Sequence, residues 1–229
     1  MRRWIAVLIL TLGTSPAWGQ RLDPINTSNG ACNAPCATLT RYFNSPAIGE
    51  LLIVEAGWGG QSLKVTISDG VNTYHRLSGP TDVGSTMRSE IWYAINTGNP
   101  QGVTITVDGP TLPGWFDGIL IQSIGVSGIN RKNPIDLKTI ATNTGAGRNF
   151  TVTSGALQSS HEMLFGLFIE SAAGAPYSVP QGWTEIGGGE AVTLSEYAVI
   201  PMPGIQPITG TAQSDVAWAG VAIGINPAP

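Results

Sequence analysis

The stretch GELLIVEAGW, from Gly49 to Trp58, determines the expected fold of this 229-residue chain. Four aliphatic residues follow Glu50 without a break, which is typical of a β-strand buried on both faces. A second stretch of the same kind, HEMLFGLFIES, runs from His161 to Ser171 and places an acid where Glu50 stands in the first. Both stretches therefore predict central strands of a β-sheet.

The rest of the chain from Thr38 onward alternates between apolar and polar residues, as strands with one solvated face do. The clearest runs are TLTRYF, LKVTIS, RSEIWYAI, GVTITV, GILIQSIGV, NFTVTS, LSEYAVI and WAGVAIGI. Clusters of Gly, Pro, Asn and Asp separate them, and no run beyond residue 20 has a sustained helical period. So many strands with short turns predict an all-β protein, as a closed barrel or an antiparallel β-sandwich, and the sandwich is our prediction.

The two halves of the chain resemble each other in order and spacing. The runs from SEIWYAI to WFDGILIQSIGV match the runs from SEYAVI to WAGVAIGIN. Glu90 then matches Glu196 and Trp115 matches Trp218, at intervals of 25 and 22 residues, although short β-rich segments also converge by composition. We therefore expect a pseudo-repeat, about 41–128 and 148–226, within a single sandwich domain, 41–229.

The first 19 residues have the composition of a secretory signal peptide. An Arg-Arg pair precedes the apolar run Trp4–Leu12, and Ala17 and Gly19 offer a small-residue cleavage site. The run is too short to span a bilayer, which needs about 20 apolar residues. The alternative is a buried N-terminal helix. The sequence thus predicts a protein that is secreted or exported to the periplasm, with no membrane span.

Few charged side chains remain in the exported chain. Without the two N-terminal arginines, nine basic side chains stand against 15 acidic ones, a net charge of about −6. Charged residues make up 11% of the sequence, against a norm of about 25%. A mildly acidic chain with no basic cluster is a poor nucleic-acid binder, because that affinity depends on Lys and Arg contacts to phosphates.

Cys32 and Cys36, in ACNAPCA, are the only cysteines. In an exported chain they predict a local disulfide within an N-terminal segment, residues 20–40. The alternative is half of a metal site, but only His75 and His161 exist to complete it. We therefore predict a disulfide, no metal and no cofactor.

Five motifs together resemble a widespread group of secreted bacterial β-sandwich modules of jelly-roll-like type. They are GELLIV, SDGVNTY, IWYAIN, VTITV and ILIQSIGVSGI, and the resemblance covers roughly Arg41–Ile225. It implies a jelly-roll-like sandwich with DGVNTY between adjacent strands. It implies no catalytic residues, because no activity is assigned to that group.

The run ISDGVNTYHRL, residues 67–77, combines an acid, an asparagine, aromatic rings and a histidine. Asp69-Gly70 is a strong hairpin signal, so we expect a turn between two strands. The alternative is a cation or ligand site built from Asp69, Asn72 and Tyr74. Calcium prefers six to eight oxygen ligands, usually with several carboxylates, and this run supplies one carboxylate. We keep the three residues as candidate ligand contacts.

Four glutamates occupy matching places in the two halves: Glu50 and Glu162 before a central strand, Glu90 and Glu196 within a later strand. We expect structural roles, in which each carboxylate accepts backbone N–H groups or pairs with an arginine. The alternative is catalysis by Glu50 and Glu162. Glycoside hydrolysis would then require the two carboxyl groups about 5–10 Å apart across a cleft.

The two histidines are the other catalytic candidates. His75 could act as a general base, since an unperturbed imidazole titrates near neutral pH, and His161 precedes one of the acids. Neither has an obvious Ser and Asp context, and no G-x-S-x-G elbow is present. The run Gly187–Gly189 lacks the lysine and helix of a phosphate-binding loop.

Five tryptophans follow the predicted signal peptide. Trp92, Trp115 and Trp218 lie in or beside strand patterns and are expected in the core. Trp58 and Trp183 lie at strand ends among glycines, where an exposed indole would suit stacking on sugar rings. The alternative is that both fold back over the core, because Trp is usually highly buried.

These patterns predict an exported, non-catalytic β-sandwich for extracellular binding, adhesion or surface assembly, with carbohydrate as a candidate ligand. The partner would be a polysaccharide or a cell-surface component, and the sequence is compatible with an oligomer. In this interpretation, Trp58→Ala or Trp183→Ala weakens retention on a polysaccharide without lowering the melting temperature. The alternative is a polysaccharide-degrading enzyme, a glycoside hydrolase or lyase, with the acids or histidines above in a groove.

Overall fold

The computed structural model describes most of the chain beyond residue 20. The described ranges are 21–32, 36–42, 46–59, 64–108, 118–171, 177–186 and 193–229. The predicted signal peptide, residues 1–19, lies outside these ranges, and so does Trp115. Within them no helix is long and apolar enough to cross a membrane.

The described residues form strands and no helix. In chain order the strands are β1 (Arg21–Cys32), β2 (Thr38–Tyr42), β3 (Leu51–Trp58), β4 (Lys64–Ser68), β5 (His75–Val83), β6 (Met87–Ile95), β7 (Gly102–Asp108), β8 (Ile119–Ser127), β9 (Ile135–Thr153), β10 (Glu162–Glu170), β11 (Tyr177–Ser178), β12 (Thr184–Glu185), β13 (Thr193–Ile200) and β14 (Pro207–Ile225).

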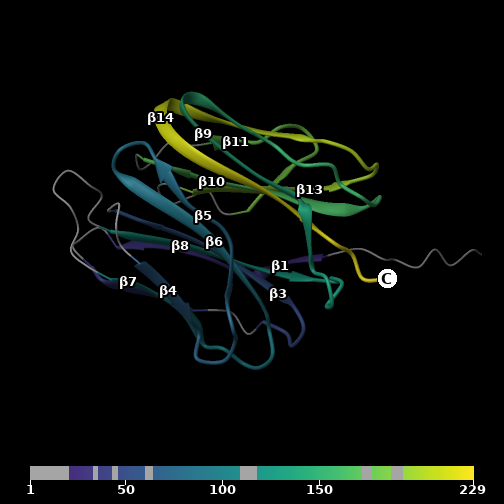
Figure 1. Cartoon of the computed structure of the whole chain (residues 1–229), viewed down its shortest axis with the longest axis horizontal. Helices are drawn as coiled ribbons and strands as arrows, with labels where there is room; N and C mark the ends of the chain where they lie inside the picture. The colour runs from purple at the N-terminus through teal and green to yellow at the C-terminus, as the bar shows by residue number, and fades with distance from the viewer. Residues whose placement is uncertain are drawn as a thin grey trace, which may run out of the picture.

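The strands pair into three sheets (Figure 1). The first sheet has the order β1-β8-β3-β6-β5, and the third, smaller sheet has the order β2-β7-β4. The second sheet has the order β11-β14-β10-β13-β12, with β9 paired to β14. The register of the long β9–β14 pair shifts between Thr211 and Val216, so each of these strands is divided into two parts.

The strands β3 and β10 are buried along their whole length. Ile53 and Phe165 meet in the core between the first and second sheets. On its other face, Val54 packs in the core between the first and third sheets. Leu164 packs on the other face of β10 against Ile208, from the first part of β14. Burial on both faces explains why these two stretches are apolar without alternation.

The prediction of an antiparallel, all-β sandwich is confirmed, and the sheets do not close into a barrel. The predicted disulfide between Cys32 and Cys36 is also confirmed. It joins the end of β1, in the first sheet, to the residues before β2, in the third sheet. Because β1 pairs with β8 over 21–32, the N-terminal segment is part of the sandwich and does not precede it as a separate segment.

The centres of the first two sheets have the same arrangement. β3 lies between β8 and β6, and β10 lies between β14 and β13, with antiparallel pairing throughout. The registers differ, however. Glu90 pairs with Ala56 on β3, and Glu196 pairs with Gly166 on β10. When Glu50 is matched with Glu162, the counterpart of Gly166 on β3 is Val54. The two glutamates that match in sequence are therefore displaced along the strands by two residues.

The position of Trp218 corrects a second detail of the sequence alignment. Trp218 pairs with Glu170 across β10 and β14, just as Ile119 pairs with Trp58 across β3 and β8. The alignment that matches Glu50 with Glu162 also matches Trp58 with Glu170. The structural counterpart of Trp218 is therefore Ile119, and the sequence match of Trp218 with Trp115 is wrong. A comparison of short sequence motifs misses such a shift, because strand register also depends on loop length.

The sandwich has two ends. We call the end at which β3 and β10 begin the Arg131 end, because Arg131 lies in the loop after β8. The opposite end, at which β3 stops, is the Trp58 end. Leu51 and Met163, the first apolar residues of the two central strands, share one core, so the two sheets begin on the same side. The Arg131 end is on the right in Figure 1, where the C-terminus is marked.

Candidate functional site

The stretch ISDGVNTYHRL forms a turn, as predicted, but not a hairpin, because β4 pairs with β7 in the third sheet and β5 pairs with β6 in the first. β4 stops at Ser68 and β5 begins at His75. Gly70 has a φ of 75°, a conformation that glycine adopts without steric cost. The backbone N–H of Gly70 also donates a hydrogen bond to the Ser68 hydroxyl oxygen at 3.2 Å. The turn is thus built from the residue types that predicted it.

Asp69 uses both carboxylate oxygens inside this turn. Its Oδ1 accepts the backbone N–H groups of Val71 at 2.9 Å and Asn72 at 2.7 Å. Its Oδ2 accepts the Asn72 side-chain amide at 2.7 Å and the Tyr74 hydroxyl at 3.0 Å. Burial, followed by the neighbouring Asp69 carboxylate, raises the pKa of Tyr74, so the tyrosine stays a hydroxyl donor.

Asn72 extends the same network to the loop after β6. Its Nδ2 donates to Asn96 Oδ1 at 3.1 Å, and its Oδ1 accepts the Thr97 backbone N–H at 2.8 Å and hydroxyl at 2.9 Å. Asn96 in turn donates to the carbonyls of residues 46 and 47. The three candidate residues of the turn do lie together. Their polar groups bind one another and the backbone, which assigns them to holding three loops at the Arg131 end.

We expect Asn72→Ala to lower the free energy of unfolding by about 1–3 kcal/mol, because it strips hydrogen bonds from Asp69, Asn96 and Thr97 and leaves their polar groups unpaired. Urea denaturation measures this change. The matched control is Thr73→Ala, at an exposed neighbouring position, which should stay within about 0.5 kcal/mol of the parent. Equal loss in both variants would contradict the structural role of the network.

Trp58 is buried, so the expected exposed indole is wrong at this position. Its side chain is 1% exposed and packs between the first and third sheets. Trp183 is half-buried and packs against the separate core of the second sheet. The two indoles therefore do not form one platform for sugar rings. Both fold back over a core, completely for Trp58 and in part for Trp183.

Glu50 and Glu162 have the structural role that was predicted for them. Both are buried just before or at the start of a central strand. Glu50 Oε2 accepts the backbone N–H of Ala47 at 3.0 Å, three residues earlier. Glu162 Oε1 accepts the backbone N–H of Ser159, also three residues earlier, at 3.0 Å and its hydroxyl at 2.8 Å. Each acid thus fixes the turn that leads into its own strand.

Glu90 and Glu196 have opposite surroundings, although they match in sequence. Glu90 accepts hydrogen bonds from Arg76 Nη1 at 3.0 Å and Trp92 Nε1 at 2.9 Å. Glu196 is fully buried, and neither of its oxygens has a hydrogen-bond partner among the described residues. Burial, followed by the charge of Glu185 on the paired strand, raises the pKa of Glu196 to about 8. The predicted structural pairing therefore holds for Glu90 and fails for Glu196.

Two more buried acids were not selected from the sequence. Burial raises the pKa of Glu55, in the middle of β3, to about 8. Burial also raises the pKa of Glu170 to about 7, against the opposing influence of the Tyr177 hydroxyl, whose geometry falls short of a hydrogen bond. Near neutral pH the Glu55 carboxyl is thus largely protonated, and the Glu170 carboxyl is protonated in part. Neither lines the two hollows described below.

The two histidines have different surroundings. His75 is exposed on β5 with its ring 5.6 Å from that of Tyr93. His161 is exposed before β10, with a φ of 64°, and its backbone N–H donates to the Ile200 carbonyl at 2.7 Å. In the described ranges no three His, Cys, Asp or Glu side chains gather as metal ligands.

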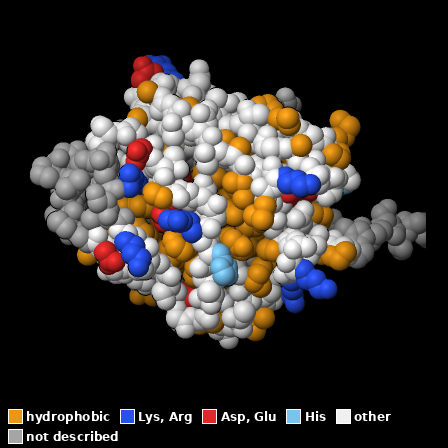
Figure 2. Space-filling model, in the orientation of Figure 1, with side chains coloured by type: hydrophobic (Ala, Val, Ile, Leu, Met, Phe, Trp, Pro, Cys, Tyr) orange, Lys and Arg blue, Asp and Glu red, His pale blue; other side chains and the backbone are white. Residues whose placement is uncertain are grey.

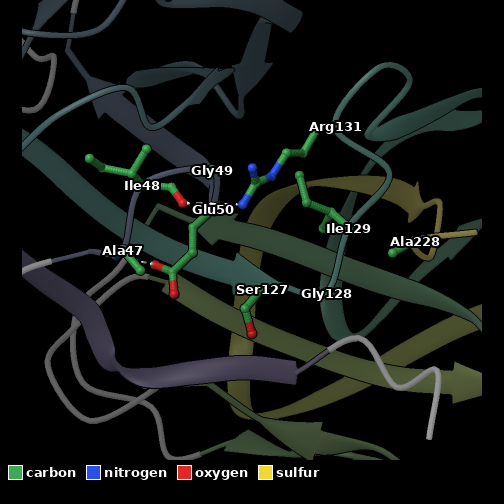
Figure 3. Close-up of a pocket in the computed structure, with 9 residues that line it drawn as sticks. All are labelled: Ala47, Ile48, Gly49, Glu50, Ser127, Gly128, Ile129, Arg131 and Ala228. Carbon is green, nitrogen blue, oxygen red and sulfur yellow. Dashed lines mark hydrogen bonds between the residues drawn. The ribbon is translucent and has the colours of Figure 1, made fainter. Parts of the chain in front are cut away.

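A hollow of about 290 Å³ lies at the Arg131 end (Figure 3). It is lined by Ala47, Ile48, Gly49, Glu50, Ser127, Gly128, Ile129, Arg131 and Ala228. The Arg131 guanidinium lies over Gly49, and its Nη2 donates to the Ile48 carbonyl at 3.3 Å. Gly49 has a φ of 89°, and a Cβ at this position would overlap the guanidinium. The carboxylate of Glu50 points toward Ala47 and away from Arg131 (Figure 3).

A second hollow, of about 450 Å³, adjoins the first. The two share Ile129, Arg131 and Ala228. The second is otherwise lined by Asn130, Lys132, Asn133 and Pro229. Arg131 therefore stands between two neighbouring hollows that offer a guanidinium, an ammonium and two side-chain amides.

The loop that carries Arg131 is fixed by hydrogen bonds. Asn130 Oδ1 accepts the backbone N–H groups of Lys132 at 3.1 Å and Asn133 at 3.3 Å. The Asn130 backbone N–H donates to the Asn226 carbonyl at 2.9 Å, and Asn226 Nδ2 donates to the Asn133 carbonyl at 3.0 Å. The segment after β14 thus holds this loop in place.

No protein-family model, curated protein or solved structure matches the chain. The resemblance to secreted bacterial β-sandwich modules therefore remains a prediction. The candidate site has to be judged on its own geometry.

Arg131 is the residue that the sequence analysis missed. One signal was available: Arg131-Lys132 is the only adjacent basic pair beyond residue 3, in a loop rich in asparagine. Its partner in the hollow, Gly49, gave no separate signal. The two residues are 82 positions apart, and only the tertiary structure brings them together.

Proposed function

We propose that this chain is an exported, non-catalytic β-sandwich that binds an extracellular surface component, with polysaccharide as the candidate partner, through its Arg131 end. The distribution of exposed apolar side chains carries the proposal. Among the described residues, the exposed large hydrophobic side chains are Tyr42, Ile48, Val71, Leu137, Val199, Met202 and Ile205, with exposed fractions of 45–74%.

All seven side chains lie at the Arg131 end. They stand at the end of β2, before β3, in the turn after β4, near the start of β9, and at or after the end of β13. In Figure 2 apolar surface is visible on the right-hand side, toward the same end, as well as along the middle of the face shown. Apolar side chains concentrated on one part of a surface are typical of an interaction site.

The surroundings of the candidate catalytic residues, glutamates and histidines, favour a binding function over catalysis. Glu50, Glu90 and Glu162 already hold turns or neighbouring side chains through hydrogen bonds. The exposed His75 lies beside the ring of Tyr93, and the exposed His161 lies before β10 with its backbone N–H bound to the Ile200 carbonyl.

We expect the triple variant Ile48→Ser, Met202→Ser and Ile205→Ser to lower retention on insoluble polysaccharides by roughly fivefold or more. The reason is that three side chains lose the gain from apolar contact, while their exposure keeps the effect on folding small. The measurement is the bound fraction after sedimentation with cellulose, chitin, xylan and calcium pectate, together with the unfolding midpoint.

The control for this experiment is Lys64→Ser with Asp215→Ser, two exposed positions at the Trp58 end, which should leave retention unchanged. Equal retention of both variants on every polysaccharide that the parent protein binds would remove the Arg131 end from the proposal. New reducing ends or unsaturated sugars released by the parent protein, and abolished by Glu162→Gln, would favour the polysaccharide-degrading alternative.

A further inference from the structure

We propose that the hollow around Arg131 binds the carboxylate of a uronic-acid unit, so that the partner of this chain is an acidic polysaccharide. This inference rests on the proposed function, since it names the ligand class of the same end of the sandwich. Nothing in the sequence comparisons assigns a ligand to this site. Four features of the hollow lead to it: a held guanidinium, unused donors, local charge and size.

The first feature is that the guanidinium is held in place before any ligand arrives. It rests over Gly49, where no other residue type leaves room for it, and its Nη2 is bound to the Ile48 carbonyl. The Arg131 loop is itself fixed by Asn130 and by Asn226. A side chain that is already ordered loses less entropy on binding, so its hydrogen bonds contribute more to affinity.

The second feature is that most donors of this guanidinium have no partner among the residues that the structure describes. An arginine side chain has five N–H donors, and the bond to Ile48 uses one of them. The ion pairs among the described residues join Arg76 to Glu90, Arg88 to Asp82 and Arg148 to Asp215, and none includes Arg131. A planar fork of free N–H groups matches a carboxylate, which it can bind through two parallel hydrogen bonds.

The third feature is the local charge. Lys132 is exposed beside Arg131, and Lys138 is exposed on the nearby start of β9. Four acids of the same end accept backbone N–H groups: Glu50, Asp69, Asp136 and Glu162. Of these, Glu50, Asp136 and Glu162 are buried. The accessible charge around the hollow is therefore positive, although the whole chain is acidic, and it favours an anion.

The fourth feature is the size and lining of the two hollows. Their volumes, about 290 and 450 Å³, are within or close to the range of roughly 300–1,000 Å³ that is usual for small-ligand sites. The side-chain amides of Asn130 and Asn133 line the second hollow, where they are suited to sugar hydroxyl groups. Ile48 and Ile129 offer apolar contact to a ring. One or two sugar units with a carboxylate fit this combination better than a lipid headgroup.

The test uses trigalacturonate and its neutral counterpart, galactotriose, with the full mature chain. NMR titration should show shifts from trigalacturonate at the Arg131 Nε–H and at backbone amides of 47–50 and 127–131, and none from galactotriose. Arg131→Gln should weaken trigalacturonate binding tenfold or more, and Arg131→Lys should restore it only in part, because an ammonium lacks the planar fork. The matched control, Lys138→Gln, should weaken it by less than threefold.

Several outcomes would overturn this inference. One is equal binding of galactotriose and trigalacturonate, and another is undiminished trigalacturonate binding by Arg131→Gln. A third is binding of inorganic phosphate or of phosphatidylglycerol vesicles without binding of trigalacturonate.

Unchanged unfolding midpoints establish that the variants are folded. If the apolar triple variant loses retention on polysaccharides while Arg131→Gln keeps its uronate binding, the proposed function stands and only the acidic ligand fails. If the parent protein binds no polysaccharide, both fail.

Discussion

Trp58→Ala is expected to lower the free energy of unfolding by about 3–5 kcal/mol, the usual cost of removing a buried tryptophan. The indole is 1% exposed and fills the core between the first and third sheets. Its neighbours across the sheet are Arg88 on β6 and Ile119 on β8. These strands cannot move into the cavity left by the indole without breaking their hydrogen bonds to β3. Because a domain of this kind is stabilised by only about 5–15 kcal/mol in total, much of the chain would unfold at 37 °C.

Urea denaturation followed by circular dichroism measures this effect. Trp183→Ala is the comparison, because the second indole is half-buried and should lose less than half as much stability. The same experiment decides whether Trp58 can serve a ligand. A variant with the parent's unfolding midpoint and reduced polysaccharide retention would show that the indole is accessible, against the burial described above.

Glu55→Gln is expected to remove one large contribution to the loss of stability at alkaline pH, beside those of Glu170 and Glu196. The Glu55 carboxyl lies between Ile91 and Gln122, with Oε2 unpaired among the described residues, and burial raises its pKa from 4.5 to about 8. Between these two pH values the unfolded chain releases a proton that the folded chain retains. The contribution of Glu55 to the free energy of unfolding therefore falls as pH rises, by on the order of 5 kcal/mol, and this fall ends above about pH 8.

Glutamine has nearly the shape of the protonated acid but does not titrate. The difference in unfolding free energy between Glu55→Gln and the parent should therefore be small at pH 4 and should grow in favour of the variant up to about pH 8. Urea midpoints at several pH values measure it. Glu90→Gln is the control, because that carboxylate is paired with Arg76, and its variant should gain nothing at alkaline pH. A difference for Glu55→Gln that does not change with pH would contradict the burial of a protonated acid.

Much of the fold follows from local sequence patterns. Continuous apolar stretches at Leu51–Trp58 and Glu162–Glu170 predicted the two central strands, and Asp69-Gly70 predicted a turn. The acids before these strands also kept their predicted role. A carboxylate that binds a backbone N–H three residues earlier depends on its immediate neighbours alone, so the sequence contains the whole interaction.

The candidate site depended on contacts between distant parts of the chain. Trp58 and Trp183 both stand at strand ends beside glycine, but one is covered by another sheet and the other only in part. Glu90 and Glu196 match in sequence, yet a shift in register gives one an arginine partner and the other none. Burial of this kind is a property of what lies across the sheet.

Local patterns were sufficient to predict an antiparallel, all-β chain with a local disulfide, because strand periodicity, turn residues and cysteine spacing are all local quantities. The place where a ligand is to be sought follows instead from contacts between distant parts of the chain. Arg131 becomes a held, unpaired cation because Gly49, from a loop 82 residues earlier, leaves space beneath it. The exposed apolar side chains likewise gather at one end because the two sheets begin on the same side.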